Sequence, residues 1–234
     1  MGHVSKRLIV ALDLAEPVRA DELVEKLSPL GVSFKVGLEL FMAGGPAMVA
    51  KLASRHNLFL DLKFYDIPNT VAAAVKGAAE LGVWMLNIHA SGGRDMMLAA
   101  REAIDASVNK PLLCAVTILT SMNNDLLAET GNPLKITDQV SILSKLAADC
   151  GLDGVICSPL EIAAVKKTVS SQFLTITPGI RPRGENKSDQ ARVADPAGAI
   201  KAGGDYLVVG RPITGADDPL GAARKILAEM GEVT

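Results

Sequence analysis

The chain has 234 residues, of which 49% are hydrophobic, 21% are charged and 3% are aromatic, and its net charge at pH 7 is -2. A nucleic-acid-binding protein needs a basic surface and often stacking rings, so this composition argues against that class and favours a small ligand. No apolar run approaches the ~20 residues of a membrane span, and the start MGHVSKRLIV lacks the features of a secretory signal, so we expect a soluble, cytoplasmic protein.

Eight short apolar runs, several of them rich in β-branched residues, follow one another along the chain and predict β-strands. In chain order they cover residues 8–14, 33–40, 58–64, 84–90, 112–119, 154–159, 173–179 and 206–212. Amphipathic segments with apolar residues three and four apart follow these runs. They predict helices over residues 21–31, 45–56, 70–82, 93–107, 137–151, 159–169, 195–204 and 219–231.

This alternation of strand and helix requires a parallel sheet that is covered by helices. Eight such units within 234 residues predict a single-domain (β/α)8 TIM barrel over residues 1–234. A doubly wound sheet is the alternative fold, but it usually has fewer strands and often a glycine-rich first turn. The first turn here, ALDLAEP, has no glycine, so the barrel is favoured.

Polar and charged residues gather where the predicted strands end, which is where a barrel carries its functional site. They are Asp13, Lys35, Asp61, Lys63, His89, Thr117, Thr120, Ser158, Arg181 and Arg211. Asp61 and Lys63 are two residues apart in one strand, so they share a face. Lys35, Asp61, Lys63 and Asp66 would form a series of alternating charges that is neutral in sum, which lowers the cost of placing it in a dry pocket.

Two further features complete the predicted barrel. The segment of residues 179–195 is polar and without periodicity, and we interpret it as a lid that closes over a phosphate. The loops after strands seven and eight, which contain Arg181, Gly210 and Arg211, are where barrels often bind phosphate. The three cysteines, Cys114, Cys150 and Cys157, form no metal-binding spacing and are predicted to be buried thiols. His89 is interpreted as a rim histidine rather than a general base.

The phrases ALD, FKVG, DLKFYDIPNT, VTILTSM, TPGIRP, DQ and VVGRPI, in this order and spacing, resemble the orotidine 5'-monophosphate decarboxylase family. The resemblance implies a homodimeric barrel that converts orotidine monophosphate to UMP and CO2 without a metal or an organic cofactor. It implies four catalytic residues: Lys63, as the proton donor to C6 of the pyrimidine, with Asp61, Lys35 and Asp66.

The same resemblance implies a set of substrate-binding residues. Asp13 and Lys35 would contact the ribose, and Thr120 with Ser121 would lie near the pyrimidine. Arg181, Gln190, Gly210 and Arg211 would serve the phosphate, with Gln190 carried by the lid. Asp66, Ile67 and Thr70 would complete the site of the neighbouring subunit.

Two other functions are consistent with parts of the pattern. Sugar-phosphate decarboxylases and aldolases of the same barrel group carry a D-x-K-x-x-D string and use magnesium with an additional acid, for which Glu39 lies near enough in the sequence. The phrases GIRP and LTSM favour the nucleotide enzyme instead. A nucleotide-binding barrel without catalytic activity is the other alternative, although every expected charged residue is present.

Overall fold

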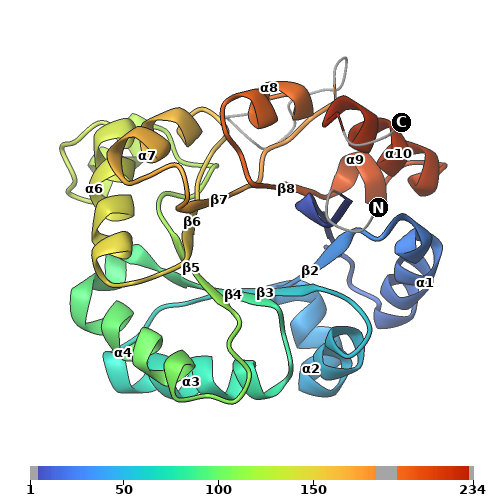
Figure 1. Cartoon of the computed structure of the whole chain (residues 1–234), viewed down its shortest axis with the longest axis horizontal. Coiled ribbons are helices and arrows are strands. Elements are labelled where there is room, and N and C mark those ends of the chain that lie inside the picture. Colours follow the sequence, from blue (N-terminus) through green and yellow to red (C-terminus); the bar gives the residue numbers. More distant parts are fainter. Residues whose placement is uncertain (1–4, 183–193, 232–234) are drawn as a thin grey trace.

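The structure is a computed structural model, and it describes residues 5–182 and 194–231. Its eight strands close into one parallel barrel in which each strand pairs with the next along the chain and β1 pairs with β8 (Figure 1). This arrangement confirms the predicted (β/α)8 fold. The strands are β1 Leu8–Ala11, β2 Ser33–Gly37, β3 Leu58–Phe64, β4 Met85–His89, β5 Leu112–Val116, β6 Gly154–Ile156, β7 Leu174–Thr177 and β8 Tyr206–Val209.

Helices surround the barrel on its outside, as Figure 1 shows. They are α1 Pro17–Leu27, α2 Leu38–Ala53, α3 Pro68–Glu80, α4 Gly93–Asp105, α5 Asn124–Glu129, α6 Ile136–Asp149, α7 Ile162–Thr168, α8 Pro196–Lys201, α9 Arg211–Thr214 and α10 Pro219–Glu229. Short 3-10 helices occupy Ser5–Arg7, Ser28–Leu30 and Ala90–Gly92. None of the helices in residues 5–182 and 194–231 is long and apolar enough to cross a membrane.

Because side chains alternate along a strand, the barrel has two separate apolar cores. The larger core lies between the strands and the helices, and it includes Val10, Val36 and Leu60. The smaller core fills the inside of the barrel, where Ile9 and Phe59 are buried. Trp84 and Tyr206 pack edge to face at 5.1 Å between ring centroids and join this inner core near the amino ends of the strands. The inside of the barrel is therefore filled below its carboxyl rim.

Carboxylates at the amino ends of the strands hold neighbouring strands together. Asp205, which directly precedes β8, accepts hydrogen bonds from the backbone N–H of Thr175 at 2.8 Å and from its hydroxyl at 3.0 Å. The ammonium group of Lys166 lies 2.6 Å from the same carboxylate oxygen. These bonds fix the start of β8 against β7.

Several helix boundaries differ from the prediction; α1, for example, covers Pro17–Leu27 where residues 21–31 were predicted. α2 begins at Leu38, directly after β2, whereas a strand was predicted to run to residue 40. Gly45 interrupts α2 with φ 65° and ψ -173°, a conformation that glycine adopts at little cost, so the predicted start at residue 45 is the start of its second half. The short helices α5 and α9 were not predicted, because they are too short to show periodicity.

Candidate active site

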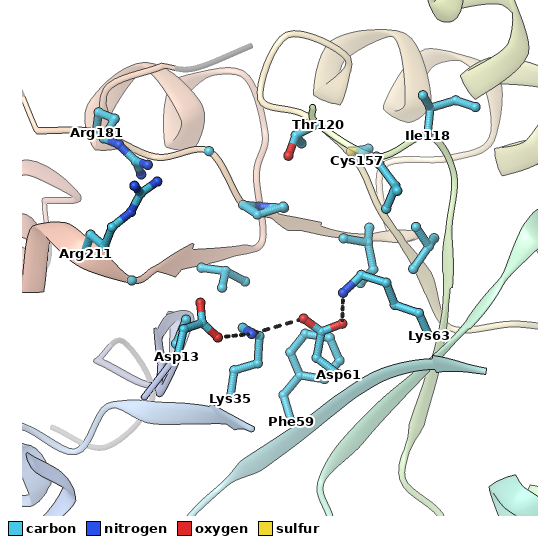
Figure 2. A pocket seen from close by; sticks show the side chains of 18 residues that line it. Asp13, Lys35, Phe59, Asp61, Lys63, Ile118, Thr120, Cys157, Arg181 and Arg211 are labelled. Atoms are coloured by element: carbon cyan, nitrogen blue, oxygen red, sulfur yellow. Dashed lines mark hydrogen bonds and ion pairs between the residues drawn. The ribbon is translucent and has the colours of Figure 1, made fainter. Parts of the chain in front are cut away.

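A cavity of about 420 Å³ opens at the carboxyl ends of the strands, a volume within the range of small-molecule sites. Its lining mixes charged side chains with apolar ones (Figure 2). The lining residues are Ala11, Asp13, Lys35, Phe59, Asp61, Lys63, Val116, Ile118, Leu119, Thr120, Ile156, Cys157, Pro178, Gly179, Arg181, Val208, Gly210 and Arg211. The cavity lies where the sequence predicted a site.

Four charged side chains form a continuous series along one side of the cavity (Figure 2). The ammonium group of Lys35 lies 2.9 Å from Asp13 Oδ1 and 3.2 Å from Asp61 Oδ2. The ammonium group of Lys63 lies 2.8 Å from Asp61 Oδ1. The series is therefore Asp13, Lys35, Asp61 and Lys63, with no net charge.

Asp13 is a member of this series within one chain, whereas Asp66, which was predicted to belong to it, lies outside the cavity of its own chain. Asp66 is exposed, and its Oδ1 accepts the backbone N–H of Ile67 at 2.6 Å. Within its own chain Asp66 does not line the cavity, and its predicted role in the neighbouring subunit's site stays a prediction.

Burial and charge oppose each other at the centre of the series. Burial alone would lower the pKa of Lys35, but the carboxylates of Asp61 and Asp13 outweigh burial and raise it. Burial alone would raise the pKa of Asp61, but Lys35 and Lys63 outweigh burial and lower it. Both groups are therefore ionised at neutral pH, although each is only 8% exposed.

The backbone of β3 is irregular at Lys63. The register between β3 and β4 shifts between Leu60 and Phe64, and Lys63 has φ 53°. Among residues 5–182 and 194–231 it is the only non-glycine residue with a positive φ. Asp61 and Lys63 do share a face, as predicted, but the bulge and not regular alternation sets the direction of Lys63.

Asn87 of β4 connects Asp61 with Lys63. Its Nδ2 donates a hydrogen bond to Asp61 Oδ1 at 2.7 Å, and its Oδ1 accepts the backbone N–H of Lys63 at 2.8 Å. Sequence reasoning missed Asn87, although one polar residue within the apolar run WMLNIHA was a usable signal.

Gly37, in the phrase FKVG, was quoted in the prediction without a role. A Cβ at this position would lie 3.0 Å from Lys35 Nζ and 3.3 Å from Asp13 Oδ1. The absence of a side chain therefore leaves room for the ion pair of Lys35 with Asp13.

Two arginines lie on the other side of the cavity from Lys63, with their guanidinium groups turned toward each other (Figure 2). Arg181 follows β7 and donates to the carbonyl oxygen of Ile180 at 2.9 Å, and Arg211 begins α9 after β8. Thr120 lines the cavity as well. The structure thus places positive charge at the end of the cavity formed by the last two strands.

Gly210 also lines this end of the cavity. A Cβ there would make only ordinary contacts at 3.6 Å, with Ala11 Cβ and Asp13 Oδ2. Packing within the protein alone therefore does not require this glycine.

Several predicted residues lie outside the cavity. Ile67, Thr70 and Ser121 are exposed and do not line it. Gln190 falls within residues 183–193, outside the described residues, as does most of the predicted lid. The two ends of the lid segment lie side by side, because Arg181 donates its backbone N–H to the carbonyl of Ala194 at 3.0 Å.

His89 is half-buried beside the cavity, with its ring centroid 5.4 Å from that of Tyr65. Burial lowers its pKa, the positive charge of Lys63 lowers it further, and Asp61 partly offsets both effects. A neutral imidazole at pH 7 agrees with its interpretation as a rim histidine.

The three cysteines are free and buried, as predicted. Glu39, the candidate magnesium ligand, is exposed in the first turn of α2. In the part of the chain that the structure describes, no group of three or more His, Cys, Asp or Glu side chains is arranged to hold a metal ion.

Comparison with known proteins places this geometry in a family. A family model described as "Orotidine 5'-phosphate decarboxylase / HUMPS family" matches residues 6–226. The chain is 51% identical to a protein of Saccharophagus degradans named orotidine 5'-phosphate decarboxylase, over 100% of this chain and 99% of the relative. It is 49% identical to a protein of the same name from Hahella chejuensis, over 97% of this chain and 98% of the relative.

A solved structure resembles the chain closely as well. The crystal structure of orotidine 5'-phosphate decarboxylase from Lactobacillus acidophilus superposes with a TM-score of 0.85 at 40% identity, over 95% of this chain and 98% of that chain.

Proposed function

The chain belongs to the orotidine 5'-phosphate decarboxylase / HUMPS family, and from this premise we propose that it converts orotidine 5'-monophosphate to UMP and CO2. Its full-length relatives carry the name of one carboxy-lyase, which makes the chain a decarboxylase of that family. The observation that carries the proposal is the ammonium group of Lys63, which Asp61 holds at 2.8 Å inside a cavity that has two arginines at its far side.

A lysine ammonium group suits this reaction. When the bond between C6 and the carboxylate breaks, CO2 leaves and the electron pair remains on C6. A fixed cation beside C6 stabilises that charge as it develops, because it needs no reorganisation at the moment of reaction. Lys63 then donates a proton to C6, which gives UMP, and regains a proton from solvent.

The charges around Lys63 serve the same step. Asp61 orients the ammonium group, and Lys35 keeps Asp61 ionised. Asp61 beside the substrate carboxylate would also repel it by about 4 kcal/mol at 4 Å and an effective dielectric constant of 20. We rank stabilisation of the transition state above this repulsion as the source of rate.

The far side of the cavity is proposed to bind the phosphate. Arg181 and Arg211 supply guanidinium groups suited to phosphate oxygens. Gly210 has no side chain, which leaves room for the phosphate to approach the backbone. Gln190 would add a contact from the lid, as the resemblance implies. Asp13 with Lys35 would contact the ribose, and Thr120 with Ser121 would lie near the pyrimidine.

The protein is proposed to act as a homodimer in which Asp66, Ile67 and Thr70 complete the partner's site. All three are exposed beside the rim, after β3. Large apolar side chains are exposed after β3, Tyr65 at 61% and Ile67 at 66%, and at the start of α2, Leu38 at 58% and Met42 at 80%. An apolar surface beside a charged rim supports contact with a second copy.

An assay with purified protein, orotidine monophosphate and excess EDTA tests the proposed function. Loss of orotidylate absorbance at an undiminished rate is expected, since the proposed chemistry takes its cation and its proton from Lys63. Activity that vanishes with EDTA and returns with magnesium would favour the sugar-phosphate group of enzymes. Binding without any turnover would favour a non-catalytic barrel.

Mixing two inactive variants tests the shared site. Lys63→Ala and Asp66→Ala chains should form hybrid dimers in which one of the two sites is intact, so part of the activity should return. No activity despite demonstrated subunit exchange would place Asp66 in the site of its own subunit.

A further inference from the structure

Asn87 closes a ring of hydrogen bonds around the proposed catalytic lysine. Asp61 Oδ1 accepts both Asn87 Nδ2 at 2.7 Å and Lys63 Nζ at 2.8 Å, while Asn87 Oδ1 accepts the backbone N–H of Lys63 at 2.8 Å. One amide group therefore holds the carboxylate that binds the ammonium group and also the backbone that carries it. The proton transfer itself makes no use of Asn87.

The backbone of Lys63 needs such a partner. Its φ of 53° brings the Cβ close to the following carbonyl, which is unfavourable for every residue except glycine. The register pairs of β3 with β4 skip from Leu60 to Phe64 and omit residues 61–63, so pairing with β4 does not fix Lys63. The side chain of Asn87 takes the hydrogen bond that a neighbouring strand would otherwise accept.

Burial makes both hydrogen bonds consequential. Asn87 has no exposed surface, and an unsatisfied amide at that depth is costly. Both polar atoms of its side chain form hydrogen bonds with residues of the site, Nδ2 with Asp61 and Oδ1 with Lys63. An asparagine that only filled the inside of the barrel would not need this arrangement, since apolar residues fill the layer below it.

We propose that Asn87 is a positioning residue, which fixes the left-handed backbone of Lys63 and the orientation of Asp61 so that the ammonium group points into the cavity. The inference rests on the proposed function, because the direction of Lys63 matters for turnover only if that lysine acts on the substrate. Asn87 itself does not line the cavity in which the substrate would bind.

Asn87→Leu is the first test, because leucine has a similar volume and makes neither hydrogen bond. We expect kcat to fall about 100-fold, the loss typical of a catalytic group displaced by about 1 Å, while KM changes less than about threefold. Thr175→Val is the matched control, since it removes a partly buried hydrogen bond from a buried strand residue to a carboxylate, at the other end of the barrel. Its kcat and KM should stay within about twofold of the wild-type values.

Asn87→Asp gives a signature in pH that a purely structural role would not produce. A protonated carboxyl group at position 87 offers one donor and one acceptor, as the amide does, whereas an ionised one offers no donor and repels Asp61. The kcat of Asn87→Asp should therefore rise toward the wild-type value as the pH falls from 8 to 5, while the deficit of Asn87→Leu stays constant.

The surroundings of position 87 support this reading of the Asn87→Asp variant. The titratable groups there are Asp61 and Lys63 on β3, Lys35 on β2, His89 on β4 and Cys114, the register partner of Asn87 on β5. Burial raises the pKa of Cys114 well above its usual value, so this thiol stays protonated over the range tested. Every comparison is made relative to wild type at the same pH, which removes the titration of the shared groups.

Hydrogen exchange of the Lys63 amide provides a readout that does not depend on activity. The amide should exchange at least about tenfold faster in Asn87→Leu than in wild type, and at an unchanged rate in Thr175→Val. If wild type does not decarboxylate orotidylate, the proposed function fails, and the exchange rate still decides whether Asn87 holds Lys63.

Two outcomes would overturn the role of Asn87. One is an Asn87→Leu protein with wild-type kcat and wild-type exchange at Lys63. The other is an Asn87→Asp protein that is as slow as Asn87→Leu at every pH. Should the leucine variant not fold, the aspartate variant carries both measurements.

Discussion

The two ends of the barrel use the same pair of groups, a carboxylate and a lysine, for different purposes. At the amino ends Asp205 binds Lys166 and also both the backbone N–H and the hydroxyl of Thr175, so its bonds join one strand to the next. At the carboxyl ends Asp61 binds Lys35 and Lys63, and all three side chains line a cavity. The two carboxylates differ in their surroundings: Asp205 contacts the neighbouring strand, whereas Asp61 lines the cavity.

One fold thus separates the residues that stabilise it from those that act on a ligand. The carboxylate at the amino end is used to close the sheet, and its change should alter the free energy of unfolding. The carboxylate at the carboxyl end holds cations in place for a ligand, and changes around it should alter turnover first. Four substitutions test that separation, three by the size of their effect and the fourth by its pH dependence.

Lys63→Ala should produce the largest change. Removing the cation that stabilises the developing charge, and with it the proton donor, should lower kcat by about 1,000-fold or more. UMP should still bind through the arginine end of the cavity, which calorimetry can measure. The exposed Lys76 of α3 offers a matched control, since Lys76→Ala should leave kcat unchanged. Near-normal turnover of Lys63→Ala would end the assignment of Lys63 as proton donor.

Arg211→Ala should mainly weaken binding. The loss of a charge-assisted hydrogen bond to phosphate should raise KM by about 10- to 100-fold and change kcat less. Steady-state kinetics at several substrate concentrations separates the two parameters. Arg224→Ala on α10, an exposed arginine, should have no effect on either. A variant that lost kcat alone would place Arg211 in the chemistry and not in phosphate binding.

Asp205→Asn should affect stability but not turnover. The substitution leaves Lys166 beside a neutral amide, and we expect a loss of about 1–3 kcal/mol in the free energy of unfolding. Urea unfolding measures this loss, while kcat should remain within about twofold of wild type. Asp149→Asn, which removes an exposed ion pair with Lys145, should cost less than about 1 kcal/mol. A large loss of kcat in Asp205→Asn would contradict the separation of the two ends.

Asp61→Asn should lower turnover, because Asp61 orients the ammonium group of Lys63, and it should also change how the free energy of unfolding depends on pH. The folded protein lowers the pKa of Asp61 despite its burial, because Lys35 and Lys63 lie beside it. The ionised carboxylate therefore stabilises the fold above the unfolded pKa of about 3.9, and this contribution is lost as the pH falls through the lower folded pKa. The difference in unfolding free energy between wild type and Asp61→Asn should be constant at neutral pH and shrink in acid. A difference that grew in acid would reverse the sign of the pKa shift.

Much of this architecture could be predicted from the sequence because it follows periodicity. Eight apolar runs gave eight strands, and the residues at their ends met at one rim, including Lys35 and Asp61 from adjacent strands. The phosphate end could be anticipated as well, since Arg181 and Arg211 directly follow the last two strands.

The missing parts depend on geometry that sequence spacing does not determine. Spacing could not show that Asp13 joins the charge series within one chain while Asp66 lies outside its own cavity, because this depends on where two loops turn. Regular alternation could not show the positive φ of Lys63 either, since it arises from a register shift between two strands. Asn87 was missed because its role is defined by that shift.

The irregularity in β3 has a consequence for enzyme design. Copying the letters D-x-K onto a regular strand of another barrel would reproduce the residues but not their convergence, because the lysine would lack its left-handed turn. Moving this site to another barrel would require the same register shift in the strand that carries the lysine. It would also require an asparagine on the adjacent strand. The smallest part of this site that could be moved to another protein is therefore the pair β3 and β4 with its register shift. A design that replaced this shift with regular pairing would no longer direct the lysine side chain into the cavity.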